Sequence, residues 1–319
     1  MEINSIYANV VGAEWNAQEM LGQLQQAIAY FSNNLYYVDE CGAVITPPLG
    51  PVAAVRADVV GHSLGGLIGR EMWYLPEFTH ETNYDQGYIH KLITVGTPHL
   101  GSHDALKLMD GSSDCVRALS ALTAGPLTGV PSFAFNTLTI DGTVVSGGAA
   151  DLVGDGTFGG SSALIQQLAV QSTYALLGLS APVLRMATVA GQASQSQFSA
   201  IDVFLSTGYT AGIALRKICP TDFLAINFTG TLWRNVFNGE DSDALVSVGS
   251  ALNVPYPNTY DAANVLLSTI HGHGTVDDLG FGSPHLQEQL SGAPAKVITL
   301  LNTSVTCNVF SDVPTLTSK

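Results

Sequence analysis

Hydrophobic residues in the first part of the chain have the spacing of a helix. Between residues 17 and 31 the apolar positions recur every three or four residues, the spacing of one helical face: Ala17, Met20, Leu21, Leu24, Ala27, Ile28 and Phe31. Asn16, with Glu19 three residues later, has the pattern of a capping box. We therefore expect a helix over 17–31 with Asn16 as its N-cap.

The next stretch alternates between strand and helix patterns. Residues 56–61 form a short apolar run typical of a buried strand, and 64–75 have a helical pattern that Pro76 ends. Residues 91–95 predict a second strand. Strand, helix and strand in succession indicate an α/β protein with a parallel sheet.

The middle of the chain, 103–228, has a different pattern. It is rich in Gly, Ala, Ser and Leu, and it offers amphipathic helix candidates at 161–178 and 198–215. We interpret it as an insertion rather than as more sheet.

Strand patterns return after the insertion. Residues 231–237 predict a strand that an acidic turn follows, and 265–270 predict the last strand. Apolar residues between Val297 and Leu301 predict a final helix against the sheet. The chain thus divides into 1–102, 103–228 and 229–319.

Composition narrows the class of protein. The chain has 11 basic and 26 acidic residues and a net charge of −15, which disfavours binding to nucleic acid. Polar residues interrupt every apolar stretch before about 18 residues accumulate, so we expect no transmembrane helix. The low lysine content, with many Gly, Ser, Thr and Ala residues, indicates an extracellular or exported protein, although no signal peptide is visible.

The cysteines and glycines give no sign of a cofactor. The four cysteines, Cys41, Cys115, Cys219 and Cys307, are too far apart in sequence to form a zinc-ligand pair. They allow three disulfide pairings, and four buried thiols remain the alternative. The glycine-rich segment 154–160 lacks the lysine of a P-loop, so we expect no bound nucleotide and no cofactor.

The segment Gly61-His62-Ser63-Leu64-Gly65 carries the chemistry. It has the pattern G-x-S-x-G between a predicted strand and a predicted helix, the context in which a serine becomes a nucleophile. Small residues two before and two after Ser63 would keep neighbouring backbone from clashing, and Gly65, Gly66 and Gly69 would let the helix pack closely on the sheet. The N–H of Leu64 would stabilise a developing oxyanion. A turn serine without catalytic function is the alternative.

A serine hydroxyl needs a base and an orienting acid. With this motif the order along the chain is serine, acid, histidine. Asp243 follows the 231–237 strand, and His271 ends the 265–270 strand, so both satisfy the order. Asp241 and His273 stay open as alternatives. The remaining histidines, and Glu240 in the acidic turn, are less suitable: His62, His80, His90, His99, His103 and His285.

Four segments resemble lipases and related serine esterases of the α/β-hydrolase superfamily. Residues 57–67 resemble the nucleophile elbow of that family, and 94–102 resemble the strand and loop that follow it. Asp243-Ala244-Leu245-Val246 resembles the family's acid turn, usually Asp-Gly-Leu-Val, with Ala244 in place of the glycine. Ile270-His271-Gly272 resembles the histidine loop.

The resemblance implies an α/β-hydrolase fold, in which a mostly parallel sheet is flanked by helices and 103–228 forms a largely helical lid. It implies a lipase or carboxylesterase that forms an acyl-enzyme on Ser63 and contacts lipid interfaces transiently. An acyltransferase or a polyester depolymerase would use the same triad. Some lipases of this kind hold a structural calcium, for which Asp277 and Asp278 are candidates, but we expect no metal.

The chain departs from the family before the first helix. The family usually has a strand and a loop some 60–80 residues upstream of the elbow, and that loop provides a second oxyanion donor. Only Ile3 to Val10 precede the first helix here, and Ile6-Tyr7-Ala8-Asn9 resembles the strand after that loop. We therefore expect the N-terminal strands to be missing. A catalytically inactive hydrolase-like domain that binds lipids or partners is the alternative function.

Overall fold

A computed structural model describes residues 12–33, 37–38, 44–45, 54–103, 105, 137–140, 143–146, 151–154, 162–169, 184–197, 240–243, 246–254, 262–267, 292–307 and 311–312. Its helices are α1 (Ala13–Asn33), α2 (Leu64–Glu71), α6 (Ala163–Ala169), α11 (Val248–Ala251) and α12 (Ala293–Leu301). Short 3₁₀ helices occupy Met72–Tyr74, Pro76–Phe78, Glu81–Asn83 and Ala262–Asn264. The strands are β1 (Tyr37–Val38), β2 (Val44–Ile45), β3 (Ala57–His62), β4 (Ile89–Val95), β5 (Thr137–Ile140), β6 (Thr143–Ser146), β7 (Arg185–Gln192), β8 (Val265–Leu267) and β9 (Ser311–Asp312).

The central sheet has four parallel strands in the order β3-β4-β7-β8, and β9 pairs antiparallel with the start of β7. Its register places Gly61 beside Thr94 and Val95 beside Val189. Because parallel strands run in one direction, the carboxyl ends of all four meet at one edge. This confirms the predicted parallel α/β sheet, and it places everything that follows these strands on the same side of the molecule.

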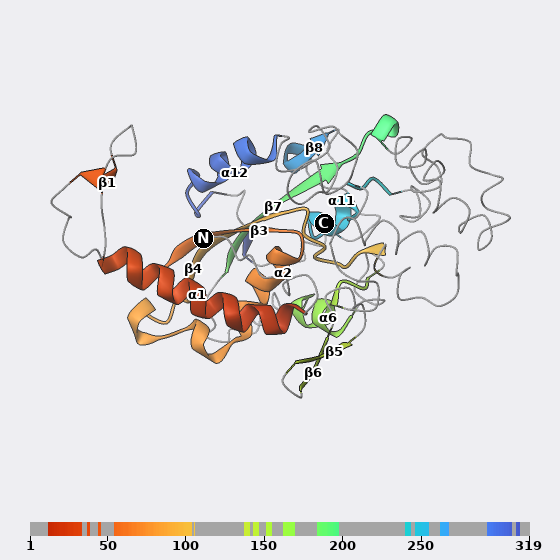
Figure 1. Ribbon diagram of the computed structural model, residues 1–319. Helices are drawn as coiled ribbons and strands as arrows, with labels where there is room; N and C mark the ends of the chain where they lie inside the picture. The colour runs from red at the N-terminus through yellow and green to blue at the C-terminus, as the bar shows by residue number, and fades with distance from the viewer. Residues whose placement is uncertain are drawn as a thin grey trace.

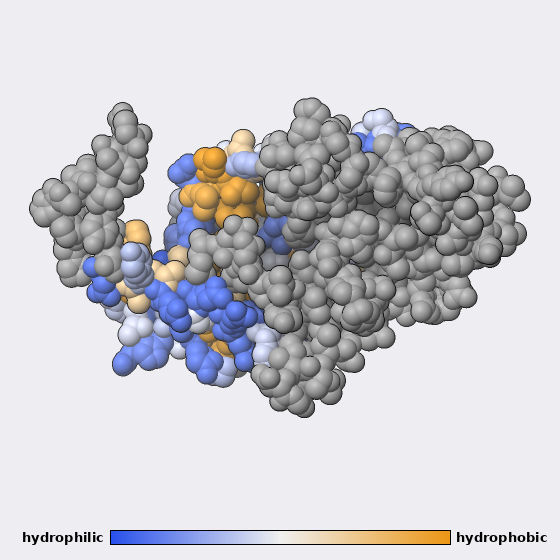
Figure 2. Space-filling model, in the orientation of Figure 1, coloured by the Kyte–Doolittle hydropathy of each residue, from blue (hydrophilic) through white to orange (hydrophobic). Residues whose placement is uncertain are grey.

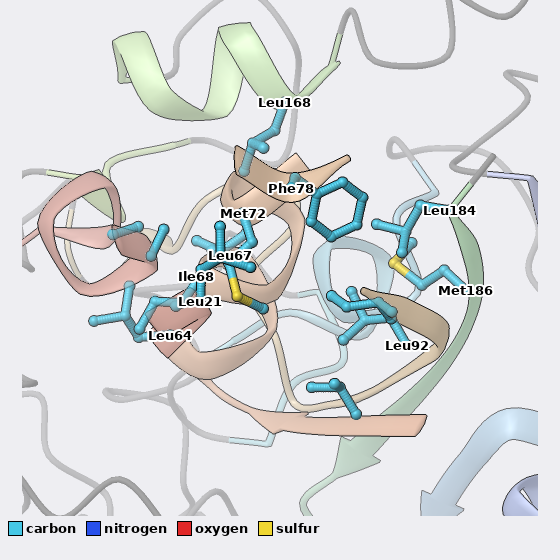
Figure 3. Packing of buried hydrophobic residues seen from close by; sticks show 14 of the residues in the cluster. Leu21, Leu64, Leu67, Ile68, Met72, Phe78, Leu92, Leu168, Leu184 and Met186 are labelled. Carbon is cyan, nitrogen blue, oxygen red and sulfur yellow. The ribbon is translucent and has the colours of Figure 1, made fainter. Parts of the chain in front are cut away.

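Helices cover both faces of the sheet (Figure 1). One face is covered by α2, with α1 and α6 outside it, and the other by α12. In the first layer Leu67 of α2 and Met72, at the start of the next 3₁₀ helix, are fully buried and pack with Leu21 of α1 and Leu168 of α6 (Figure 3). Burial of such side chains stabilises the fold by about 1.5–3 kcal/mol each.

The other layer is held at the end of α12. Lys91 of β4 lies under that helix, and its Nζ donates hydrogen bonds to the carbonyls of Leu301 (2.6 Å) and Thr303 (3.0 Å). An ammonium at this position compensates the partial negative charge of a helix C-terminus. Apolar residues gather on the outer side of α12 (Figure 2), where Ile298 is 58% exposed.

The first helix begins earlier than predicted. It starts at Ala13, so Asn16 is not its N-cap but lies buried in the first turn, where its Nδ2 donates to the Gly12 carbonyl (3.0 Å). The free N–H of Ala13 donates instead to Oδ2 of Asp151 (2.7 Å). A carboxylate from a distant segment thus provides both the acceptor and the charge that a helix N-terminus favours.

The interpretation of 103–228 as an insertion rather than more of the central sheet is wrong for residues 185–192. Residues 185–192 form β7, which lies between β4 and β8 in the central sheet. This strand is rich in small residues, and because it is buried on both faces it does not alternate polar and apolar positions as a half-exposed strand does. The candidate helix at 161–178 is helical over Ala163–Ala169, and those at 198–215 and the strand at 231–237 lie outside the described residues.

Two segments of the chain, one between Ser102 and Val153 and one between Ala193 and Ser242, have ends that are paired with each other. We call these two segments the excursions. Ser102 and Val153 form an isolated parallel bridge, and the Ser102 N–H donates to the Leu152 carbonyl (2.7 Å). Likewise the Ala193 N–H donates to the Ser242 carbonyl (2.7 Å). Each excursion therefore leaves and re-enters the core at one point.

In the part of the chain that the structure describes, no helix combines the length and the apolar character needed to cross a bilayer.

Candidate active site

Ser63 lies in a strained turn between β3 and α2. Its backbone has φ 52° and ψ −128°, in the left-handed half of the φ/ψ map that residues with a side chain seldom adopt. Two hydrogen bonds hold it there: the Ser63 N–H donates to the Val95 carbonyl (2.9 Å), and the Gly66 N–H donates to the Ser63 carbonyl (3.1 Å). Such a conformation costs about 1–3 kcal/mol and persists only where the surroundings enforce it.

Glycines make the turn sterically feasible. A Cβ at Gly61 would lie 2.7 Å from the Gly66 Cα, and a Cβ at Gly66 would overlap the Thr97 side chain. A Cβ at Gly69 would lie 2.9 Å from Leu92 Cδ1, so the expected close packing of α2 on the sheet is confirmed there. The expectation for Gly65 is wrong, because a Cβ at that position meets no atom within 4 Å in the described part of the chain.

The N–H of Leu64 is the predicted oxyanion donor at the elbow. The N–H of Ser63 is used by the Val95 carbonyl. Leu64 is the first residue of α2, so its N–H has no acceptor within the helix. It also lies at the positive end of the helix dipole, which favours a developing negative charge. The geometry is consistent with the predicted function of the Leu64 N–H.

Backbone hydrogen bonds lead from the elbow to the acid turn across the strand ends. The Ser63 N–H bonds to Val95 at the end of β4, and the Gly96 N–H donates to Val189 of β7 (2.9 Å). Directly after β7, the Ala193 N–H bonds to Ser242. The segment that contains Asp243 is therefore attached to the edge of the sheet where Ser63 lies.

Asp243 is the buried carboxylate of that segment. It is 0% exposed, and its Oδ1 accepts a hydrogen bond from the Val246 N–H (2.7 Å), while its own N–H donates to the Val246 carbonyl (3.1 Å). Both bonds fix the orientation of the carboxylate. Asp241 is only half-buried and participates through its backbone carbonyl, which accepts the Val248 N–H (2.8 Å).

His271, the predicted base, and His273, its alternative, both lie outside the described residues. The strand before them, β8, is parallel to β7 and pairs Leu267 with Gln192. Its carboxyl end is therefore at the same edge as Ser63 and the acid turn. The assignment of His271 stays a prediction, and so does the triad as a whole.

A second group of buried polar residues, which the sequence does not predict, lies between α2 and β4. His99 is 1% exposed; its Nδ1 is 3.0 Å from Arg70 Nη1, and its Nε2 is 2.9 Å from Thr94 Oγ1. Burial and the neighbouring Arg70 charge hold the pKa of His99 well below its usual range. His99 is thus neutral, and since arginine only donates, Nδ1 accepts and Nε2–H donates to Thr94. Engagement of both ring nitrogens excludes His99 as the catalytic base.

Arg70 connects this group to two helices. It is fully buried on α2, and its Nη2 donates to the Leu168 carbonyl of α6 (2.6 Å). Burial lowers the pKa of Arg70 to about 10, which still leaves it charged at neutral pH. A buried arginine on the helix of an active-site turn has no sequence signature apart from its position in an otherwise small and apolar helix.

Glu71 is a buried carboxylate next to Arg70. Burial, followed by the negative charges of Glu14 and Asp151, raises its pKa to about 7. Its Oε1 accepts a hydrogen bond from Gln167 Nε2 of α6 (3.1 Å), and its Oε2 has no hydrogen-bond partner among the described residues. No three His, Cys, Asp or Glu side chains of the described ranges are grouped to hold a metal ion, and Asp277 and Asp278 lie outside those ranges.

Comparison with known proteins agrees with this geometry. Residues 49–122 match the sequence model of the family described as "Putative serine esterase (DUF676)". That match includes β3, the elbow, α2 and β4. Among curated protein sequences, none matches the chain. Among solved structures, the mature form of the Bacillus licheniformis lipase BlEst2 aligns with a TM-score of 0.41 at 14% identity, over 91% of this chain and 75% of that one.

The predicted fold class is confirmed: the chain has the core of an α/β-hydrolase. The parallel sheet with helices on both faces and the strained serine between β3 and α2 are the defining features of that fold. The elbow segment is similar to that of serine esterases.

Proposed function

We propose that this chain is a serine hydrolase that cleaves carboxylic esters through an acyl-enzyme on Ser63. The observation that carries the proposal is the backbone of Ser63, with φ 52° at a strand-to-helix turn. Glycines at 61 and 66 and a bond to Val95 enforce that conformation. Folding alone does not require a strained serine at this point, whereas a nucleophile must present its Oγ above the edge of the sheet.

The proposed reaction proceeds in two acyl-transfer steps. His271 accepts the proton of Ser63 as the Oγ forms a bond to the ester carbonyl carbon, and the carbonyl oxygen becomes an oxyanion that the Leu64 N–H stabilises. The tetrahedral intermediate collapses and the C–O bond to the alcohol breaks, while His271 gives its proton to the leaving alkoxide. Water then attacks the acyl-enzyme in the same manner, which releases the carboxylic acid and restores the Ser63 hydroxyl.

Asp243 is the proposed acid of this triad. Its carboxylate would accept a hydrogen bond from His271, fix the tautomer of the imidazole and stabilise the imidazolium that forms in each step. Its full burial and its bonds to Val246 support this function, because a carboxylate of fixed orientation can hold a histidine ring in place. Asp241, two residues earlier in the same turn, is only half-buried, whereas Asp243 is fully buried.

The experiment that tests the proposal is covalent labelling with a fluorophosphonate probe, located by peptide mass spectrometry. Wild-type protein should carry the adduct on Ser63, and Ser63→Ala should carry none. His271→Ala should slow labelling by at least about 10³-fold, whereas His273→Ala is the matched control and should label at close to the wild-type rate. Folded wild-type protein that does not label would contradict the proposed function.

A matched pair of variants tests the acid. Asp243→Asn should lower kcat for an activated ester by about 10⁴-fold, the loss seen when the acid of such a triad is replaced by an amide. Asp241→Asn changes the same charge two residues away and should have little effect. Equal losses, or a larger loss for Asp241→Asn, would assign the acid to Asp241.

The substrate class we propose is an ester with an apolar acyl chain. The similarity of 49–122 to serine esterases supports an ester, and the low proportion of charged residues, 12%, favours an uncharged substrate. A panel of p-nitrophenyl esters from acetate to palmitate would show whether the activity is that of a carboxylesterase or of a lipase.

We further propose that the protein is exported and contacts lipid interfaces transiently. A comparison of its activity on emulsified and on dissolved ester would test the interface contact.

A further inference from the structure

We propose that Ser250 is a positioning residue that sets the placement of the acid turn relative to the nucleophile elbow; this inference rests on the proposed function. Ser250 lies on α11 and is 1% exposed. Its Oγ donates to the Gly101 carbonyl (2.6 Å) and accepts from the Leu100 N–H (3.1 Å). One hydroxyl therefore satisfies two neighbouring backbone groups in the interior, 150 residues away in sequence from Leu100.

The two segments that Ser250 connects are those that carry the proposed nucleophile and acid. Leu100 and Gly101 belong to the loop after β4, and this loop begins at Val95, whose carbonyl holds the Ser63 N–H. Ser250 belongs to the helix that follows the acid turn: the Ser250 N–H donates to Ser247 Oγ (3.3 Å).

The loop that contains Leu100 and Gly101 is held in place by further hydrogen bonds and close contacts. The Gly101 N–H donates to the Pro98 carbonyl (2.9 Å), and Ser102 is paired with the segment at Leu152 and Val153. Gly101 has φ 86°, and a Cβ on it would overlap the Gly154 backbone, so only glycine fits this approach. The Ser250 hydroxyl is therefore attached to a fixed point.

The acid turn has a second polar attachment to the sheet, the backbone bond from Ala193 to Ser242. A single hydrogen bond leaves a segment free to rotate about it, and two bonds on opposite sides of Asp243 remove that freedom. Apolar contacts of Val246, Val248 and Leu252 with Ala190 press the segment onto the end of β7 but are not directional. Because a displacement of about 1 Å in a catalytic group can cost about 10²-fold in rate, the Ser250 bonds have a catalytic consequence.

The test compares Ser250→Ala with Ser247→Ala. Ser247→Ala removes the N-cap of the same helix but leaves the bonds to Leu100 and Gly101 intact, so it controls for loss of stability in α11. Ser250→Ala should lower kcat for an activated ester by about 10- to 100-fold with KM within about threefold of wild type. Ser247→Ala should keep kcat within about threefold while lowering the melting temperature.

A double-mutant cycle separates positioning from general loosening. If Ser250 acts through the acid, Ser250→Ala should slow the labelling of Ser63 in the wild-type background and have almost no further effect in the Asp243→Asn background. An equal effect in both backgrounds, or a kcat for Ser250→Ala no lower than that of Ser247→Ala, would overturn the inference. Ser250→Cys, which keeps the volume and weakens both bonds, replaces the alanine variant if the latter does not fold.

The two proposals fail in different ways. If wild-type protein does not label at Ser63, the proposed function fails and this inference fails with it. If wild-type protein labels and Asp243→Asn abolishes turnover, but Ser250→Ala behaves as Ser247→Ala does, only the inference about Ser250 is overturned.

Discussion

Arg70 donates a hydrogen bond from its Nη1 to Nδ1 of His99 across 3.0 Å in the interior of the protein. With Thr94 and the Leu168 carbonyl as further partners, this pair joins α2 to β4 and to α6. The helix that carries the elbow is therefore held by a charged hydrogen bond as well as by apolar packing.

His99→Leu should destabilise the protein by about 2–4 kcal/mol. The substitution removes the acceptor of a fully buried guanidinium and leaves Thr94 Oγ1 without its donor, and an unsatisfied buried polar group costs more than the lost bond itself. Urea unfolding followed by circular dichroism would measure the change in free energy of unfolding. A loss of less than about 1 kcal/mol would show that water or a neighbour replaces the imidazole.

The double variant Arg70→Met and His99→Leu should lose less stability than the sum of its single variants. Removal of both partners eliminates the desolvated charge together with its acceptor, whereas each single variant leaves one of them unsatisfied. Strict additivity in the same urea experiment would mean that the two residues contribute independently.

The contribution of Glu71 to stability should fall as the pH rises from about 4.5 to about 7, whereas neutral, buried His99 contributes in the opposite sense below about 6.5. The pKa of Glu71 is raised from 4.5 to about 7 in the folded protein. At Glu71 the folded state therefore binds more protons than the unfolded state in this interval, so the contribution of this residue to the free energy of unfolding decreases with pH and levels off above about 7. The expected contribution is on the order of 1–3 kcal/mol, measured by urea unfolding at a series of pH values.

Glu71→Gln is the control for this pH dependence. The amide retains an oxygen for Gln167 Nε2 and removes the titrating group, so the stability of Glu71→Gln relative to wild type should increase between pH 4.5 and 7, and the variant should be the more stable of the two at pH 8. An unchanged profile would assign the pH dependence to another group.

Gly66→Ala and Gly65→Ala should have opposite outcomes although the residues are adjacent. The added methyl group at Gly66 overlaps Thr97, and Gly66 also donates to the Ser63 carbonyl, so the substitution should cost at least about 2 kcal/mol and abolish labelling of Ser63. At Gly65 the methyl group meets open space, and the cost should be below about 0.5 kcal/mol. Thermal unfolding and fluorophosphonate labelling of both variants would check this; equal losses would contradict the packing described here.

Asp151→Ala should destabilise the start of α1 by about 1–2 kcal/mol, since it removes both the acceptor of the Ala13 N–H and a negative charge at the helix N-terminus. Asp151→Asn keeps an acceptor and removes only the charge, so it should cost less. The same charge raises the pKa of Glu71. Both variants should therefore move the upper end of the Glu71 pH window to lower pH, as unfolding at several pH values would show.

The elements that sequence predicts correctly are those whose signals are local. The strands at 56–61 and 91–95, the helix at 64–75 and the turn at Ser63 lie within a few residues of their observed bounds. The signals for these elements, which are hydrophobic runs, glycines and the terminating Pro76, are contiguous in sequence. The final helix, observed over Ala293–Leu301, was predicted from its apolar residues for the same reason.

What sequence reasoning missed depends on residues far apart in the chain. The start of α1 is determined by Asp151, 138 residues from Ala13, so the capping-box pattern at Asn16 pointed to the wrong residue. β7 has few large apolar residues, and because it is buried on both faces it also lacks the alternation of polar and apolar positions that marks a half-exposed strand. The bond of Ser242 to Ala193, which attaches the acid turn to the end of β7, joins segments that are far apart in sequence.

In the candidate site, too, the residues with a local sequence signal could be predicted, and those that depend on distant partners could not. The nucleophile and the Leu64 donor follow from one short motif, and the structure gives Ser63 the geometry that the motif requires. The choice of Asp243 over Asp241 was open in the sequence; burial and the bond from Val246 now favour Asp243. Arg70, His99 and Ser250 have no local signature, because their importance lies in partners that folding brings to them.

The paired ends of the two excursions bear on how such a protein can diversify. Ser102 is bridged to Val153, and Ala193 is bonded to Ser242. The two ends of each excursion are therefore held next to each other at the sheet. For a flexible loop each doubling of length costs only about 0.6 kcal/mol in closure entropy. Related genes can therefore differ in the length of either stretch while the edge of the sheet at Ser63 keeps its geometry, so the residues between the paired ends can evolve separately from the proposed catalytic residues.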